Sequence, residues 1–400
     1  MDFSRVTLAD DDRAFLTEVR ALLNSVVTDE VRIRDHESGE NFDEEVHLAL
    51  GAHGWLAREW LSESEGGLSP LRRRLWELET RRVQMPYFHW DTTKLIARTL
   101  KDFASSDLKG EVLPGVLTGH VRLCLGYTEP EGGSDVATCK TRAVQDGGSW
   151  VINGAKMFTS NAQNSQYVFL ITNTAPKAPK HQSLTMFLVP LTTPGIEIQG
   201  LRTVDGDRTN LVYYSDVRID DRYRVGDVHG GWTVLRSALN AEHGGTDSDA
   251  SGLNEISILA PHGTRMLETI DAVVASAASE PSIEGCLLDD QSVKYRLGRS
   301  ISRAEAAVST PGIYGRVALA QTMRDISADL MDVAGARSSL LADAARAADH
   351  RTAEKLYRLA LPSGIYGGTI EVFRNMIAQH EMGLGRPTYS PTTVARGDRA

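Results

Sequence analysis

The order of hydrophobic and polar positions divides the chain into three parts, of which the first is helical. Between residues 9 and 110, apolar residues recur at intervals of three and four, as at Phe15, Val19 and Leu23. This spacing predicts amphipathic helices that each bury one face. Glycine-containing breaks separate these helices at residues 51–54 and 66–67.

The second part has a different pattern, with short apolar runs bounded by Gly, Asn, Asp and Pro from about residue 121 to 225. Such runs predict strands rather than helices. They lie at residues 121–125, 150–152, 167–172, 184–191 and 211–217. The sequence therefore predicts an all-β unit in the middle of the chain.

The third part returns to helical spacing near Trp232 and keeps it to about residue 385. Long Ala-rich amphipathic stretches at 288–308 and 312–348, and a shorter one at 369–382, predict helices that pack as a bundle. We expect four segments: a helical domain, a β-domain, a helical bundle and a loose tail, at residues 1–120, 121–228, 229–387 and 388–400.

Composition and charge limit the classes of function. The 400 residues are 41% hydrophobic and 24% charged, which excludes a disordered or collagen-like chain. A formal net charge of -10 argues against a nucleic-acid or membrane-surface binder. No signal peptide and no apolar run of roughly 18 residues is evident, so a cytoplasmic protein is expected. We expect core thiols in a reducing compartment at Cys124, Cys139 and Cys286.

Two segments carry most of the candidate chemistry, while the usual signatures of nucleotide triphosphatases, Rossmann dehydrogenases and zinc hydrolases are absent from the sequence. Residues 126–135 read GYTEPEGGSD, a Gly-rich turn in which Thr128 and Ser134 offer hydroxyls to a planar or phosphorylated ligand. Residues 151–160 read VINGAKMFTS and bring Phe158 together with two hydroxyls. Taken singly, each segment also fits an ordinary polar turn or a core aromatic.

Together with a third segment, these motifs resemble the acyl-CoA dehydrogenase family of flavoproteins. The third segment, residues 365–369, reads IYGGT and is followed by Glu371 and Arg374. Further matches lie at residues 54–56, 66–68 and 194–195, so the resemblance covers nearly the whole chain. It implies an α+β, mainly α fold with an N-terminal helical domain, a middle β-barrel domain and a C-terminal four-helix bundle, and FAD bound between subunits.

The resemblance also implies cofactor contacts, while the scattered His residues, none of which has partners at metal-ligand spacing, indicate no metal site. Tyr127 and Thr128 would line the pyrimidine edge of the flavin, and Ser134 would face a pyrophosphate of the flavin or the thioester. Phe158 stands in the place of the family's usual Trp beside the isoalloxazine, and Ser160 in that of the hydroxyl near flavin N5. Such donors stabilise the charge of a reduced flavin. The matching C-terminal contacts are Thr369 and Glu371.

The implied reaction, α,β-dehydrogenation of an acyl-CoA thioester, needs one positioned general base. Most family members carry it as Glu in an I-Y-E-G-T segment, where this chain has Gly367. A minority use a Glu on the helix after the β-domain, and we predict Glu242 in that role. It extends an apolar stripe about 80° wide, which would desolvate the carboxylate and raise its pKa. The other residues of this stripe are Trp232, Leu235 and Leu239. The alternative is a helix end with Glu242 in solvent.

Several departures from the family pattern leave this assignment open. His243 replaces the usual Arg, and a polar run at 244–249 interrupts the helix, so a shifted register would make Asp247 or Glu255 the base. The R-x-x-F-G segment that reaches the FAD of a neighbouring subunit is not evident between 265 and 300. The Arg residues nearby that lack this context are Arg296 and Arg299. Either FAD is held differently, or a different partner chain supplies the missing Arg.

A helix Glu combined with Gly-Gly-Thr near the end resembles the actinobacterial subgroup that forms α2β2 heterotetramers acting on steroid-side-chain CoA thioesters. This implies a bulky acyl-CoA substrate, a homo- or heterotetramer, and an electron-transfer flavoprotein as acceptor. Two alternatives remain: a catalytically degenerate subunit that completes a partner's site, and a flavin oxidase or monooxygenase on the same fold.

Overall fold

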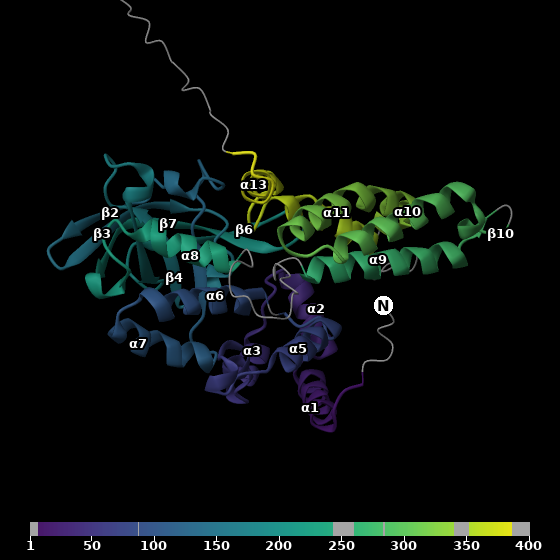
Figure 1. Cartoon of the computed structure of the whole chain (residues 1–400), viewed down its shortest axis with the longest axis horizontal. Helices are drawn as coiled ribbons and strands as arrows, with labels where there is room; N and C mark the ends of the chain where they lie inside the picture. The colour runs from purple at the N-terminus through teal and green to yellow at the C-terminus, as the bar shows by residue number, and fades with distance from the viewer. Residues whose placement is uncertain (1–6, 87, 243–259, 283–284, 340–351, 386–400) are drawn as a thin grey trace, which may run out of the picture.

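The computed structural model describes residues 7–86, 88–242, 260–282, 285–339 and 352–385. Its elements follow the predicted order of helices, strands and helices (Figure 1). The N-terminal helices pack beneath the sheet in that view, and the C-terminal helices form an elongated bundle to one side. In the described residues, no helix is both long and apolar enough to cross a membrane.

The N-terminal region is entirely helical in its regular structure. Its helices are α1 (Asp10–Val26), α2 (Asp29–Ser38), α3 (Glu44–Ala52), α4 (Trp55–Trp60), α5 (Pro70–Arg82), α6 (Phe88–Phe103) and α7 (Ser106–Leu117). Helix starts follow capping rules, because Asp43 and Ser105 each accept a hydrogen bond from the backbone N–H three residues later. The predicted break at 51–54 is confirmed: Gly54, at the start of α4, has φ +72°, a conformation that favours glycine.

The middle region is one sheet of eight strands. They are β1 (Leu123–Gly126), β2 (Arg142–Asp146), β3 (Ser149–Lys156), β4 (Tyr167–Asn173), β5 (Leu184–Pro190), β6 (Ile196–Arg202), β7 (Arg208–Asp220) and β8 (Arg224–Val225). The order is β6-β7-β3-β2-β4-β5-β8, and β1 pairs in parallel with β4. All five predicted strands are present. Sequence patterning missed β2 and β6, because most of their residues are exposed or half-buried and form no apolar run, and it missed β8, which has only two residues.

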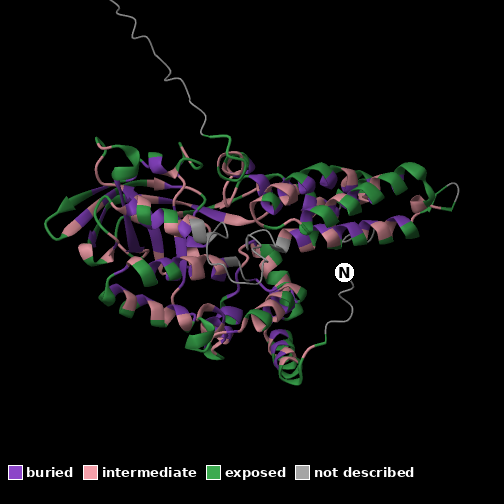
Figure 2. Cartoon of the chain, in the orientation of Figure 1, coloured by how far each residue is buried: buried purple, intermediate pink, exposed green. Residues whose placement is uncertain are grey.

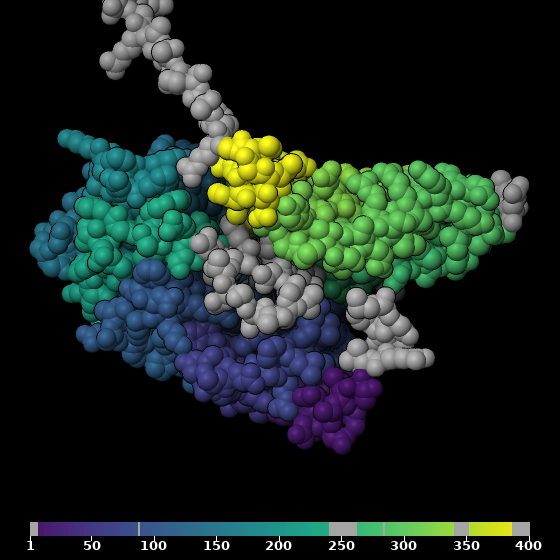
Figure 3. Space-filling model, viewed as in Figure 1, coloured from purple at the N-terminus to yellow at the C-terminus, as the bar shows by residue number. Residues whose placement is uncertain are grey.

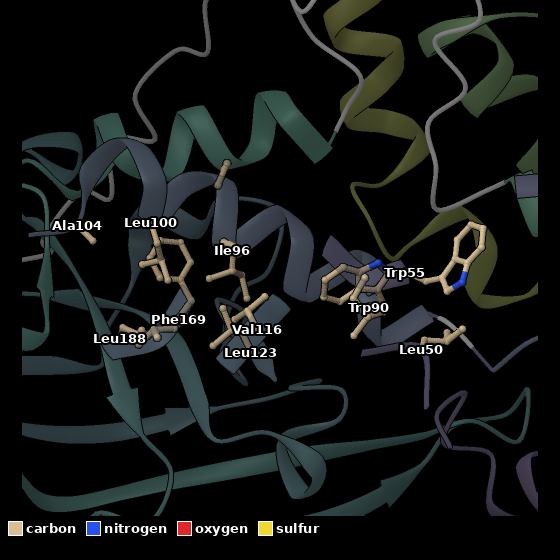
Figure 4. Packing of buried hydrophobic residues seen from close by; sticks show 14 of the residues in the cluster. Leu50, Trp55, Trp90, Ile96, Leu100, Ala104, Val116, Leu123, Phe169 and Leu188 are labelled. Carbon is tan, nitrogen blue, oxygen red and sulfur yellow. The ribbon is translucent and has the colours of Figure 1, made fainter. Parts of the chain in front are cut away.

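Strand β4 separates two hydrophobic cores, since successive side chains on a strand point to opposite faces. Phe169 and Ile171 pack with the N-terminal helices, whereas Val168 and Leu170 belong to the core on the other face of the sheet. Figure 4 shows Phe169 beside Leu100 of α6. Buried residues accordingly follow the strands of the sheet and the inner faces of the helices packed on it (Figure 2).

The C-terminal region begins with α8 and continues into a bundle with a core of its own. Its helices are α8 (Gly231–Glu242), α9 (Ala260–Ser279), α10 (Gln291–Val308), α11 (Gly312–Ala334), α12 (Thr352–Ala360) and α13 (Ile370–Met376). Met266, Leu297 and Met323 belong to the core shared by α9 to α12. In the space-filling view the bundle projects beyond the rest of the molecule (Figure 3).

Two predictions for this region need correction. The helix predicted over 312–348 ends at Ala334, because Gly335 adopts φ +70° and terminates it. Cys286 is half-buried on the short strand β10 (Gly285–Cys286) and is not a core thiol. Cys124 and Cys139 are buried, as expected.

Candidate functional site

A buried ion pair joins the first two motif segments. Lys156 Nζ lies 2.8 Å from Glu129 Oε1, and their side chains are 0% and 7% exposed. Lys156 Nζ also donates to the carbonyl of Tyr127 at 3.2 Å, and the N–H of Met157 donates to the carbonyl of Thr128 at 2.8 Å. The two segments, about twenty-five residues apart in the chain, are therefore fixed side by side through specific contacts.

Glu129 connects several segments of this site through its carboxylate. Its carboxylate also accepts the backbone N–H groups of Lys140 at 2.7 Å and Thr141 at 2.8 Å. Burial alone would raise the pKa of Glu129, but the charge of Lys156 and these hydrogen bonds outweigh it and lower the pKa to about 2. Glu129 is thus ionised at neutral pH and is poorly suited to act as a base. Sequence reasoning missed this role, although the Glu and the Lys both lie within the motifs.

The turn after β3 presents Phe158 and Ser160. Phe158 has φ +58° and Asn161 has φ +61°, a region that Asn tolerates but an aromatic residue rarely adopts. Phe158 is 52% exposed, so its ring is available to a ligand and is not part of the core. Ser160 Oγ lies 3.1 Å from Oγ1 of Thr209 on β7. An aromatic face and a hydroxyl are therefore displayed on one short turn.

The Gly-rich turn lies against the same site. Ser134 is exposed, while Tyr127 and Thr128 are half-buried. A Cβ added at Gly133 would come within 3.3 Å of Thr128, so glycine permits the close approach that the motif predicted. A surface cavity of about 230 Å³ borders this turn, with Tyr127, Gly132 and Asp135 in its lining. Pockets for small molecules typically enclose roughly 300–1,000 Å³, so this cavity alone is small for a dinucleotide.

Helix α8, which carries the predicted base, packs on α6 and β5. Leu235 is buried, and Trp232 and Leu239 are half-buried against the same core, so the predicted apolar stripe is confirmed as far as Leu239. The described part of the helix extends to Glu242, whose side chain lies outside the described residues. The same holds for the other candidate positions, His243, Asp247 and Glu255.

The third motif segment is a glycine turn held from within the bundle. Gly367 and Gly368 have φ +61° and +88°, so a Glu at position 367 would adopt a strained backbone. Arg316, which is 1% exposed, donates to the carbonyls of Tyr366 at 2.8 Å and Gly368 at 2.9 Å. The hydroxyl of Tyr366 lies 2.9 Å from Nε2 of His262 on α9. The backbone conformation at position 367 therefore favours the glycine present there over the Glu found in most family members.

The remaining predicted cofactor contacts, Thr369 and Glu371, lie at the start of α13. Thr369 caps α13 by accepting the N–H of Val372 at 3.2 Å, and Glu371 is exposed, 4.0 Å from Arg374. The hydrogen bonds of the described residues do not connect either of them to the first two segments. The two Arg residues without family context, Arg296 and Arg299, form ion pairs with Asp329 of α11. No group of His, Cys, Asp and Glu in the described ranges is arranged to hold a metal.

Comparison with known proteins assigns the family. Residues 9–120 match the model of the acyl-CoA dehydrogenase N-terminal domain, and residues 124–220 match that of the middle domain. Acyl-CoA dehydrogenase FadE26 of Mycobacterium tuberculosis is 29% identical over 96% of this chain and 99% of the relative. Acyl-CoA dehydrogenase IpdE1 of the same organism is 31% identical over 88% and 90%.

Solved structures agree with this assignment. The structure described as the Tcur3481-Tcur3483 steroid ACAD is 29% identical with a TM-score of 0.80, over 95% of this chain and 99% of that chain. The ChsE4-ChsE5 complex from Mycobacterium tuberculosis is 27% identical with a TM-score of 0.78, over 96% and 100%. The predicted fold class is thereby confirmed, and this chain belongs to the acyl-CoA dehydrogenase family of oxidoreductases.

Proposed function

We propose that this chain is a FAD-dependent acyl-CoA dehydrogenase, which introduces a double bond between the α and β carbons of an acyl-CoA thioester. The observation that carries the proposal is the buried Glu129–Lys156 pair, because it unites the two motif segments. Their union brings an exposed aromatic ring, Phe158, and the hydroxyls of Thr128 and Ser160 into one region. If the two segments were unrelated polar turns that matched the family motifs by chance, no buried ion pair would be needed to hold them together.

The donor set of this region fits a flavin. The exposed ring of Phe158 offers a flat apolar surface, and the hydroxyls of Thr128, Ser134 and Ser160 offer neutral donors to flavin oxygens and nitrogens. When bound, FAD supplies the acceptor for the hydride that leaves the β carbon. The small cavity beside the Gly-rich turn supports a cofactor site that is completed by another subunit.

We assign proton removal from the α carbon to Glu242. Support comes from α8, whose apolar stripe is packed against the core as far as Leu239, one turn before Glu242. A carboxylate that continues this stripe would be partly desolvated, so its pKa would rise toward that of an effective base. The oxygen of Glu242 would take the proton, and Gly367 takes no part.

The experiment for this assignment is Glu242→Gln, with Glu268→Gln on the exposed face of α9 as the matched control. Glu242→Gln should keep FAD bound but slow the reduction of the flavin by acyl-CoA by about 10²–10⁴-fold, which is the usual contribution of a general base. Glu268→Gln should behave as wild type. Equal reduction rates in all three proteins would remove Glu242 from the mechanism.

We further propose a bulky, steroid-like acyl group, a heteromeric assembly and an electron-transfer flavoprotein as acceptor. Support comes from the likeness to a steroid ACAD and to the ChsE4-ChsE5 complex, and from the bundle that projects from the rest of this chain. Expression with and without the product of a neighbouring gene should show whether a stable complex forms and gains flavin. A homotetramer that binds FAD fully and prefers short linear acyl-CoA would contradict this part of the proposal.

A second candidate function is a degenerate subunit that completes the site of a catalytic partner. It is favoured by the left-handed glycine at position 367 and by Arg296 and Arg299, which are tied to Asp329 within the bundle. The two functions differ in a simple observable. A degenerate subunit would leave the rate of its complex unchanged in Glu242→Gln, whereas a catalytic one would not.

A further inference from the structure

The turn at residues 158–161 holds Phe158 in a backbone conformation that an aromatic residue disfavours, whereas Asn161 tolerates it. Phe158 and Asn161 both have positive φ, +58° and +61°. For an aromatic residue this is a genuine outlier, and such strain persists only where the surroundings impose it. Some contact outside the turn must therefore supply the energy that keeps Phe158 in place.

Asn210 on β7 supplies these contacts. Its backbone carbonyl accepts the N–H of Thr159 at 3.0 Å, and its side-chain Nδ2 donates to the carbonyl of Thr159 at 2.9 Å. Nδ2 also donates to Oε1 of Gln163 at 2.7 Å, just beyond the turn. Asn210 and Thr159 are both 0% exposed, so water does not compete for these bonds. Asn210 thus hydrogen-bonds both the backbone N–H and the backbone carbonyl of Thr159.

The side chain of Asn210 is specialised for donation. Both of its described hydrogen bonds run from Nδ2 to the turn region, and neither belongs to the ladder between strands. Its other polar atom, Oδ1, is buried without a hydrogen-bond partner in the described part of the structure. Burying Oδ1 without a partner costs desolvation free energy. If the side chain only filled space in the sheet, an apolar residue of the same size would avoid that cost.

We propose that Asn210 is a positioning residue, which holds the strained turn and so fixes the ring of Phe158 and the hydroxyl of Ser160 before any cofactor binds. The clamp itself follows from the contacts of Asn210. What it positions these groups for rests on the proposed flavin site. When these groups are ordered in advance, binding of the cofactor loses less conformational entropy.

The test is Asn210→Asp, which keeps the size of the side chain but removes its donors while the carboxyl is ionised. The control is Thr172→Val, which deletes another fully buried hydrogen bond in the same sheet, from Oγ1 to the carbonyl of Thr185. Amide hydrogen exchange over residues 157–163 of the flavin-free chain reports the clamp directly. The dissociation constant of FAD, measured by flavin fluorescence at pH 8 and pH 6, reports its consequence.

In Asn210→Asp, exchange over 157–163 should accelerate at least tenfold, and the dissociation constant of FAD should rise at least tenfold at pH 8. Both effects should shrink at pH 6, because a buried carboxyl protonates readily and regains one donor. Thr172→Val should change neither quantity. Equal effects in the two variants, or none in Asn210→Asp, would overturn the proposal. Failure of the wild type to bind FAD would instead overturn the proposed function, while the exchange data would still decide the clamp.

A second variant covers the case in which Asn210→Asp does not fold. Phe158→Gly removes the strain, since glycine adopts positive φ freely, so it should restore folding in the double variant. If the double variant also fails to fold, Asn210 supports the sheet as a whole and is not a clamp for the turn.

Discussion

Replacement of Lys156 by Met should destabilise the chain severely. Lys156 is 0% exposed, and its Nζ lies 2.8 Å from the Glu129 carboxylate. Met has a similar length, so the change removes the charge with little loss of volume. Glu129 would remain buried with a negative charge, stabilised by the N–H groups of Lys140 and Thr141 and by the thiol of Cys139 but by no opposite charge from Lys156.

The magnitude follows from the burial of this pair. Removal of one partner of a buried ion pair costs about 3–5 kcal/mol, a large share of the roughly 5–15 kcal/mol that stabilises a typical domain. The pKa of Glu129 is held at about 2 against the effect of burial, and without Lys156 that effect is no longer offset. The pKa should therefore rise, and the loss of stability should be smaller at pH 5 than at pH 8.

Urea unfolding of four proteins tests this reasoning: the wild type, Lys156→Met, Glu129→Gln and the double variant. The double variant should lose less than the sum of the two single losses, because it leaves no unpaired charge. Lys180→Met is the control, since it breaks the exposed ion pair with Asp135 beside the same turn and should cost under about 1 kcal/mol. A loss for Lys156→Met no larger than that of the control would refute the account of the site as an ion-pair-linked unit.

Three further outcomes are expected. Three imidazoles have pKa values lowered by burial to about 4, 3 and 3, namely His47, His89 and His262. Folding favours the neutral form of each ring, so the free energy of unfolding is highest above about pH 6.5, where the unfolded chain is also neutral at these positions. At pH 5 the unfolded chain is protonated there, and each ring lowers the free energy of unfolding by about 2 kcal/mol. Asp35 and Asp207, whose pKa values burial raises to about 6, oppose this partly. The melting temperature should therefore drop between pH 7 and pH 5, and an unchanged value would contradict the burial of these rings. Glu59→Gln should cost about 3 kcal/mol in urea unfolding, because Glu59 is 3% exposed and accepts two indole N–H groups and a Lys ammonium. Arg316→Lys should accelerate amide exchange over 365–369, since one ammonium reproduces neither the planar guanidinium nor its contact with the ring of Phe373; unaltered exchange would exclude Arg316 as the support of the glycine turn.

Much of the fold could be predicted from local patterns. Apolar spacing located the N-terminal helices, and uninterrupted apolar runs located β4 and β5, because these elements bury a face or both faces. Exposed elements such as β6 could not be found in this way. The helix predicted over 312–348 was too long, because the composition after Gly335 remains Ala-rich although the backbone leaves the helix there.

The candidate site was predicted less completely. The structure brings the first two motif segments together, and Thr128 and Ser134 lie in the expected Gly-rich turn, whereas Phe158 lies just after β3. The Glu129–Lys156 contact and the clamp at Asn210 join residues that are far apart in sequence, so no local pattern reports them. The contacts of Asn210 depend on how β3 pairs with β7, which only the folded chain determines.

The most direct test of the central claim is the visible spectrum of the purified protein, expressed alone and with its genomic neighbour, during anaerobic addition of acyl-CoA and steroid-CoA thioesters. We predict a yellow preparation whose flavin band bleaches with a competent thioester in the wild type but not in Glu242→Gln. A colourless protein in both preparations, or a flavin band that no acyl-CoA bleaches, would contradict the claim that this chain is an acyl-CoA dehydrogenase.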